Sequence, residues 1–300
     1  MATTPRSDGR AATVPGSPKG NAPATRSTGE RMLRRVLAAA ADGLGPLIAL
    51  YKPYVQGLEN LPADGRFLLV GNHTQLAAAE IILLPYFVRH TIGRQLRPLA
   101  DRNFGKGGRL QADLLAAYGA VIVSPESATE LMRANEPILV FPGGGREIPK
   151  FKGEQNTLRW DNRYGFARLA VQHRYPILTA ALLGGDDAFT SLTTRDGLFG
   201  RAGEWIGRRL TGQDGMAIPL TRGIGFTPVP HPQRMYLRFG PPIATTRPPR
   251  VAEDTWVRQV KERTQEQLQG DLDDLQRLRA TDPYRSLNPL AWGSALTPDF

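Results

Sequence analysis

The sequence predicts an α/β fold in which a mostly parallel central sheet is flanked by helices. Short apolar runs typical of buried strands recur along the chain, and stretches with helical spacing lie between several of them. Strands that alternate with helices favour parallel pairing. The chain has 300 residues, of which 41% are hydrophobic, so it is long and apolar enough to bury a sizeable core.

Five apolar runs have the length and composition of buried strands. They lie at residues 67–70, 120–124, 138–141, 177–183 and 235–239.

Helical spacing occurs in three stretches between these runs, at residues 110–118, 127–135 and 160–173. In the second stretch, Ser127 is a candidate N-cap because Glu130 follows three residues later. In the third, Phe166, Leu169 and Ala170 share one face.

A fourth helix, charged and amphipathic, is predicted at residues 251–279. Its inward-facing positions are Val260, Leu268, Leu272 and Leu275.

The segments before the sheet have a different composition. Residues 1–29 are rich in small and basic residues and hold little to bury, which predicts a disordered basic tail. Residues 30–56 are predicted to form an amphipathic helix region. Its apolar run follows a pair of arginines, so an export signal is an alternative, and it is short for a membrane span. We place the α/β domain at 57–249 and a C-terminal helix and tail at 250–300.

Composition also limits the chemistry. The chain has no cysteine, which excludes disulfides, thiolate metal sites and a cysteine nucleophile. Its net charge of +10 predicts attraction to polyanions. No GxSxG motif of a serine hydrolase occurs, and the aromatic and basic residues do not interleave as in nucleic-acid-binding modules. We therefore expect neither of those activities.

Two strand ends carry polar or glycine-rich motifs. The run at 67–70 continues into Gly-Asn72-His73, and the run at 138–141 continues into Pro-Gly-Gly-Gly-Arg-Glu. The carboxyl ends of parallel strands meet at one edge of a sheet, which is where ligands bind in open α/β folds. We therefore expect both motifs to face one cleft.

Each motif suits a particular chemistry. A neutral imidazole at His73 is able to take a proton from a hydroxyl near physiological pH. Successive glycines leave backbone N–H groups accessible to an anion, and Arg146 adds a positive charge. The candidate substrate-binding residues are Asn72, Gly143, Gly144, Gly145, Arg146 and Glu147.

These motifs resemble those of the glycerolipid acyltransferase superfamily, whose founding members acylate lysophosphatidic acid. The resemblance is nearest to the diacylglycerol-acyltransferase-like branch that includes the phytyl ester synthases. It is carried by the Asn-His corner, by FPGGGREIPKFKGEQNTLRW from Phe141, by LLGGDDAF from Leu182 and by RFGPPI from Arg238. It extends over residues 57–245.

The resemblance implies acyl transfer from a thioester, acyl-CoA or acyl-carrier protein, to a lipid hydroxyl, with His73 as general base. It implies no metal ion and no cofactor beyond the thioester co-substrate. Fatty chains are expected along apolar strand-end surfaces and near residues 81–88, a run that reads equally well as core helix.

The chain departs from the family pattern at the acid that orients the histidine. The family places an acid five residues after its histidine, and this chain has Ala78 there. Glu80 is the predicted catalytic partner of His73. Because seven residues of helix span roughly 10 Å, contact requires a non-helical corner at His73. Asp186, Asp187 and Glu147 are alternative orienting residues.

Further departures concern the acceptor. Phosphate-using members have FPEGTR where this chain has Gly143 and Gly145 in place of Glu and Thr. The second block lacks its usual arginine, and Thr179 stands for a proline in the fourth. A neutral acceptor such as diacylglycerol, monoacylglycerol or a long-chain alcohol is therefore predicted.

Residues 198–210 have an apolar stripe beside arginines, typical of a helix on an anionic membrane surface. A helix that packs this stripe onto the domain is the alternative. Together with lipid substrates, this pattern predicts a cytoplasmic protein on the inner face of the cell membrane. Two other functions stay open: an inactive lipid- or acyl-binding module of the same fold, suggested by Ala78, and a hydrolase in which His73 activates water.

Overall fold

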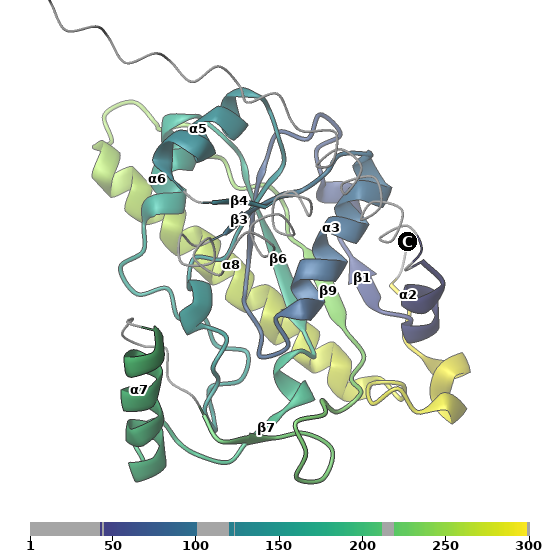
Figure 1. Cartoon of the computed structure of the whole chain (residues 1–300). Coiled ribbons are helices and arrows are strands. Elements are labelled where there is room, and N and C mark those ends of the chain that lie inside the picture. Colours follow the sequence, from purple (N-terminus) through teal and green to yellow (C-terminus); the bar gives the residue numbers. More distant parts are fainter. Residues whose placement is uncertain (1–42, 44, 101–119, 123, 212–218, 299–300) are drawn as a thin grey trace, which may run out of the picture.

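The computed structural model describes residues 43, 45–100, 120–122, 124–211 and 219–298 (Figure 1). The predicted tail at 1–29 and the predicted helix at 110–118 lie outside the described residues.

The fold is built on a seven-stranded sheet with strand order β1-β9-β6-β2-β5-β3-β4. Neighbouring strands are parallel, apart from the antiparallel pair β6–β9. The mostly parallel α/β fold predicted from the sequence is therefore confirmed. The strands are β1 (Tyr54–Gln56), β2 (Leu68–Gly71), β3 (Arg97–Ala100), β4 (Val121–Ile122), β5 (Ile138–Val140), β6 (Ile177–Leu183) and β9 (Tyr236–Phe239).

The sequence did not reveal β1 and β3. The first has only three residues. The second contains Pro98, which lacks an N–H and argues against a strand inside a sheet. Nevertheless β3 pairs with both β4 and β5, and its residues are only half-buried. Pairing partners, rather than local hydrophobicity, define these strands.

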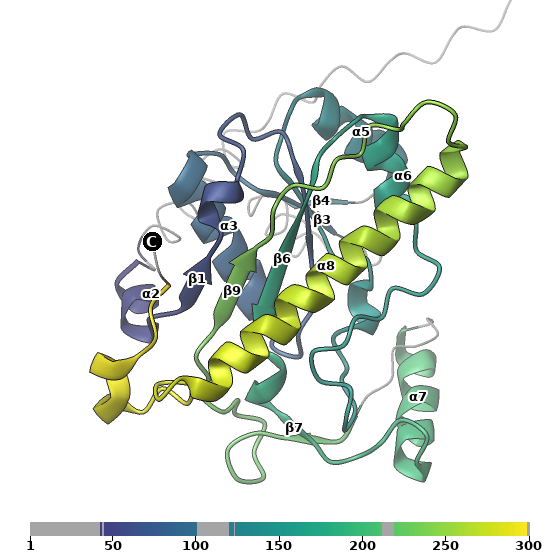
Figure 2. The ribbon, with the colours of Figure 1, turned by 180° about the vertical axis from the view of Figure 1, so that it is seen from behind.

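Helices cover both faces of the sheet (Figures 1 and 2). Successive strand residues point to opposite faces. Leu68 and Val70 of β2 pack with residues of α5 (Pro125–Arg133), α6 (Gly165–Gln172) and α8 (Glu253–Thr281). Leu69 packs on the other face, against α3 (Ala78–Ile92). The site strand β2 is thus buried on both sides.

Two helix starts differ from prediction. The N-cap of α5 is Ser124 instead of Ser127, because Pro125 suits the first helical position. Ser127 is the third helical residue and completes a capping box, since each serine side chain accepts from the other's backbone N–H at 3.0 Å. Helix α6 begins at Gly165 rather than near residue 160.

The long helix α8 has 29 residues and begins two residues later than expected. The four positions predicted to face inward, at 260, 268, 272 and 275, are fully buried.

The remaining elements lie outside the sheet. They are α2 (Gly45–Tyr51), α7 (Leu198–Thr211), the antiparallel pair β7 (Thr190–Ser191) and β8 (Thr221–Arg222), and 3₁₀ helices at Leu58–Asn60, Gly144–Arg146, Asp186–Ala188 and Pro289–Ser294. No helix in the described part of the chain combines the length and apolar character that a membrane crossing needs.

A buried group of three side chains, here named the anchor cluster (Arg234, Tyr236 and Asp282), ties the segments around Lys52 and Leu296 to the sheet. Asp282 accepts from the Arg234 guanidinium and from the Tyr236 hydroxyl, each at 2.5 Å. Arg234 also donates to the backbone oxygens of Lys52 and Leu296, each at 2.7 Å. Segments that we assigned to the regions 30–56 and 250–300 thus pack directly on the α/β domain.

Candidate active site

His73 lies in the loop that follows the central strand β2. This strand pairs with β5 on one side and β6 on the other. The loop occupies residues 72–77, and α3 begins at Ala78. The position matches the strand-end location at which open α/β folds bind ligands.

The His73 ring contacts Glu80, as predicted. Its Nδ1 lies 2.7 Å from Oε1 of Glu80, which is completely buried in the first turn of α3. The non-helical loop folds the chain back, so the axial separation of a continuous helix does not apply. The geometry gives the ring-orienting position to Glu80.

Thr74 holds the Glu80 carboxylate in place. Its backbone N–H donates to Oε1 at 2.8 Å, and its hydroxyl donates to Oε2 at 2.9 Å. A carboxylate on Nδ1 favours the neutral tautomer that carries its proton there, which makes Nε2 the basic nitrogen. The dyad therefore has the arrangement that a general base requires.

Glu147, predicted to bind substrate or orient the ring, bonds to backbone N–H groups in this structure rather than to the His73 ring. It is fully buried, and its carboxylate accepts from the backbone N–H of His73 at 3.1 Å and of Arg159 at 2.8 Å. Burial raises the pKa of Glu147, although Lys150 and these hydrogen bonds act in the opposite direction. The residue joins the glycine corner to the histidine loop.

The two aspartates that we considered as orienting residues also lie elsewhere. Asp186 is buried and accepts from the backbone N–H groups of Gln75 at 2.7 Å and Asn156 at 2.8 Å. Burial raises its pKa to about 6. Asp187 pairs with Arg279 at 2.8 Å. Asp186 thus stabilises the loop after His73, and Asp187 joins it to α8.

Asn72, a predicted substrate-binding residue, has a structural role. Its side-chain amide donates to the Leu182 carbonyl and accepts from the Leu182 N–H, both at 2.9 Å. The side chain thus continues the pairing of β2 with β6 beyond the last backbone pair. Both of its polar ends bond within the protein, and the side chain is buried.

The glycine corner lies directly against the histidine, which confirms that the two motifs meet. The Phe141 ring stacks on the His73 ring with centroids 4.2 Å apart. A Cβ at Gly143 would lie 2.2 Å from Cγ of Glu147, and Gly144 has φ of +55°. Glycine is therefore required at both positions for the corner to close around Glu147.

Three arginines surround this corner. Arg163 donates to the carbonyls of Pro142 and Gly143, both at 3.0 Å, and an Arg159 N–H donates to the Arg146 carbonyl at 3.5 Å. The Arg146 side chain is 36% exposed and lies 3.9 Å from Asp161. The sequence analysis did not identify Arg159 and Arg163 as residues of the site. Their position shortly after the glycine motif is the sequence feature that could have indicated them.

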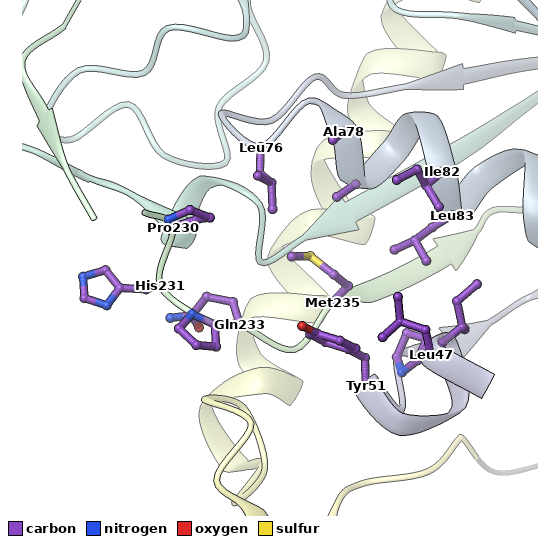
Figure 3. A pocket seen from close by; sticks show the side chains of 14 residues that line it. Leu47, Tyr51, Leu76, Ala78, Ile82, Leu83, Pro230, His231, Gln233 and Met235 are labelled. Atoms are coloured by element: carbon purple, nitrogen blue, oxygen red, sulfur yellow. The ribbon is translucent and has the colours of Figure 1, made fainter. Parts of the chain in front are cut away.

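An apolar pocket of about 350 Å³ lies next to the loop that carries His73 and the start of α3 (Figure 3), although neither His73 nor Glu80 lines it. Its walls come from α2, from residues 76–83 around the start of α3 and from the segment 230–235. Leu76, Ala78 and Ala79, which lie between His73 and Glu80 in the chain, line it. The volume is in the range of small-molecule sites. Ile82 and Leu83 also line the pocket, so part of the run at 81–88 contributes as expected, while Leu84 and Val88 belong to the core.

The site thus combines a histidine–carboxylate pair at the carboxyl edge of a mostly parallel sheet with an apolar pocket lined by the residues that follow the histidine. Residues 52–183 match the model of the family named Acyltransferase. This match confirms the resemblance seen in the motifs.

Curated relatives agree with this assignment. Phytyl ester synthase 2, chloroplastic, from Arabidopsis thaliana is 28% identical over 261 residues, which cover 78% of this chain and 36% of that protein. The DGAT1/2-independent enzyme synthesizing storage lipids from Homo sapiens is 27% identical over 161 residues, covering 53% of this chain and 48% of that protein. The chain thus spans about half or less of the length of these relatives.

Among solved structures, the 1-acyl-sn-glycerophosphate (LPA) acyltransferase PlsC from Thermotoga maritima matches with a TM-score of 0.44 and 15% identity, over 82% of this chain and 79% of that one.

Proposed function

We propose that this chain transfers a fatty acyl group from a thioester, acyl-CoA or acyl-carrier protein, to a lipid hydroxyl, with His73 as general base. The observation that carries the proposal is the 2.7 Å contact between His73 and the buried Glu80, in a chain segment whose intervening residues line an apolar pocket. The match to the Acyltransferase family model supports acyl transfer as the reaction class.

In the proposed reaction, Nε2 of His73 removes the proton of the acceptor hydroxyl as its oxygen attacks the thioester carbonyl. The tetrahedral intermediate then collapses, the C–S bond breaks, and the imidazolium returns the proton to the leaving thiolate. Glu80 stabilises the imidazolium that exists between these steps. The scheme needs no covalent acyl-enzyme.

The negative charge on the carbonyl oxygen requires prearranged donors. Backbone N–H groups of the corner Gly143–Gly145 are the candidates, because the stacking of Phe141 on His73 places this corner beside the base. Such donors are often worth about 3–4 kcal/mol in acyl transfer. Arg146, whose partner Asp161 is 3.9 Å away, is suited to a phosphate of the donor.

The acceptor that we propose is neutral. Phosphate-using members carry Glu and Thr where this chain has Gly143 and Gly145, and the Gly143 position is filled by the Glu147 side chain. Relatives named phytyl ester synthase and storage-lipid enzyme suggest long-chain alcohols and acylglycerols. The pocket next to the His73 loop is apolar enough for a hydrocarbon chain.

Radiolabelled acyl-CoA incubated with the purified protein and one acceptor at a time tests the proposal. The acceptors are diacylglycerol, a long-chain alcohol and lysophosphatidic acid. We expect ester formation with a neutral acceptor and about a 10²–10⁴-fold loss in His73→Ala. His90→Ala is the matched control, because His90 is an exposed residue of α3 that bonds only within its helix.

Each outcome has a defined meaning. Undiminished product in His73→Ala overturns the general-base role, and turnover of lysophosphatidic acid alone overturns the neutral acceptor. Release of free fatty acid instead of ester indicates the hydrolase. The inactive binding module was an alternative because Ala78 stands where the family has an acid. The contact of Glu80 with His73 supplies that acid. Retention of fatty acid without turnover would instead support the binding module.

A further inference from the structure

Helix α7 exposes its large side chains and buries its glycines. Leu198 is 82% exposed, Phe199 72% and Trp205 60%, while Gly200, Gly203 and Gly207 are buried. A helix that packed on the domain would show the reverse pattern. Figures 1 and 2 show α7 apart from the sheet and the other helices. The packed alternative for this helix is therefore excluded.

A second apolar projection follows β8. Residues 223–229 form a compact turn, in which the N–H groups of Gly223 and Ile224 donate to the carbonyls of Thr227 at 2.7 Å and Val229 at 2.8 Å. The turn presents Phe226, which is 85% exposed, together with the exposed Ile224 and Val229. The two backbone hydrogen bonds fix the shape of the turn, and its apolar side chains are exposed on its surface.

The turn is connected to both α7 and the pocket. The pair β7–β8 closes the segment that carries α7, and Leu192 donates to Leu220 at 2.8 Å next to it. Immediately after the turn, the segment 230–235 forms a wall of the apolar pocket (Figure 3). A membrane surface that contacted the turn would therefore lie near this wall of the pocket.

The charges on this surface are mainly positive. Arg201, Arg208 and Arg209 accompany the apolar face of α7, against a single acid, Glu204. In the turn, the Arg222 guanidinium lies 5.2 Å from the centre of the Phe226 ring. Basic side chains beside exposed aromatic groups suit a layer of anionic headgroups over hydrocarbon.

We propose that α7 and the turn 223–229, here named the docking surface, bind the face of an anionic lipid bilayer and hold the pocket mouth against it. The inference deepens the proposed function, because it assigns the source from which the lipid acceptor enters. Binding of the docking surface to a bilayer does not depend on acyl transfer, because the surface contains neither His73 nor Glu80.

Vesicle sedimentation with the full-length chain tests the docking surface. The vesicles are phosphatidylcholine alone, and equal parts phosphatidylcholine and phosphatidylglycerol. We expect binding to the anionic vesicles only. Trp205→Ala combined with Phe226→Ala should weaken it about 10-fold. Arg201→Glu should also weaken it about 10-fold. Trp205→Phe keeps an aromatic group and should bind nearly as wild type.

Arg258→Glu is the matched charge control, because Arg258 is exposed on α8 outside the docking surface. Equal weakening by Arg258→Glu and Arg201→Glu would show that only total charge matters and would overturn the proposal. So would wild-type binding by the Trp205 and Phe226 double variant, or a dimer in solution that this variant abolishes.

Activity measurements separate this inference from the proposed function. With acceptor embedded in anionic vesicles, the docking variants should lose activity in proportion to binding. With acceptor dispersed in detergent they should match wild type, because their dyad is intact. A chain that binds vesicles as expected without transferring acyl groups would support the docking surface and contradict the proposed function.

Discussion

Two groups of buried carboxylates occupy different parts of this molecule and are stabilised differently. In the anchor cluster, Asp282 contacts the buried Arg234 guanidinium. Around the histidine, Glu80, Glu147 and Asp186, here named the site cluster, accept mostly backbone N–H groups.

The pKa of Asp282 moves in the opposite direction from the pKa values of Asp186 and Glu147. Burial acts to raise the pKa of Asp282, but hydrogen bonds from Tyr236 and Arg234 bring it below its ordinary value. At Asp186 and Glu147 burial prevails, and their pKa values rise. A guanidinium hydrogen-bonded to Asp282 holds its carboxylate charged, whereas the nearby Lys150 and the backbone N–H groups do not offset burial at Asp186 and Glu147.

This difference matters at Glu80. Within the described part of the chain, no lysine or arginine forms an ion pair with Glu80, and its ion-pair partner is His73. The positive charge in this pair is therefore present only while the His73 ring is protonated. A fixed arginine there would compensate Glu80 permanently and reduce its effect on the basicity of the ring.

The largest expected effect is on the rate. Glu80→Gln should lower acyl transfer about 10²–10⁴-fold, because the ring loses the carboxylate that stabilises its charged form. Steady-state transfer to the preferred acceptor measures it. Asp187→Asn, whose carboxylate pairs with Arg279 instead, should change the rate less than about 10-fold. A larger loss in Asp187→Asn would assign the orienting role to Asp187.

The next effect is on the stability of the anchor cluster. Asp282→Asn leaves the Arg234 charge buried without compensation and should lower the free energy of unfolding by about 3–5 kcal/mol. Urea denaturation measures it. The control is Asp274→Asn, which removes the partly exposed ion pairs of Asp274 with Arg238 of β9 and Arg277 of α8, and should cost about 1 kcal/mol or less. Equal losses in the two variants would contradict the distinction between the clusters.

The dependence of stability on pH should differ between the clusters. The pKa of Asp186 is raised from 3.8 to about 6, so the folded state binds this proton more readily than the unfolded state. Its contribution to stability therefore grows as the pH falls from about 6 to about 4, by up to about 3 kcal/mol.

The pKa of Asp282 is lower in the folded state than in the unfolded state. Its contribution to stability is therefore complete at a pH above its unfolded-state pKa, and it is lost as the pH falls through its folded-state pKa. Unfolding free energies of wild type and Asp186→Asn between pH 4 and 7 check the sign. The variant should show a flatter profile, and an unchanged profile would count against Asp186 as its source.

The smallest expected effect concerns the stacked ring. Phe141→Leu keeps an apolar side chain but removes the aromatic contact with His73, and should cost about 0.5–1.5 kcal/mol. We expect up to about a 10-fold loss in kcat with little change in the pH profile. A shift of the profile instead would mean that Phe141 sets the pKa of the base.

The sequence alone predicted the central strands and the meeting of the two motifs, because apolar runs and strand-end polar residues are local signals. The contact of His73 with Glu80 was also predicted, from the need for an acid near the ring. The roles of Asn72 and Glu147 were not. Their partners, Leu182 and Arg159, are set by strand order and loop folding rather than by local sequence.

Elements without an apolar pattern were missed for a similar reason. Strand β3 begins with Arg97 and Pro98, and only its pairing with β5 makes it a strand. The N-cap of α5 was misplaced because the spacing from Ser127 to Glu130 looked sufficient, although Ser124 before Pro125 is the stronger start. Where two local sequence patterns compete, the segments that pack or pair with that part of the chain decide which structure forms.

The acid at the third position of α3 has a wider consequence for finding such sites. An acid in the first turn of a helix sits at the positive end of the peptide dipole, whatever the length of loop before it. The effect of the helix dipole on this acid therefore depends on its position counted from the helix start, and not on the number of residues between it and the histidine. Pattern searches that fix the histidine-to-acid interval would overlook chains built like this one.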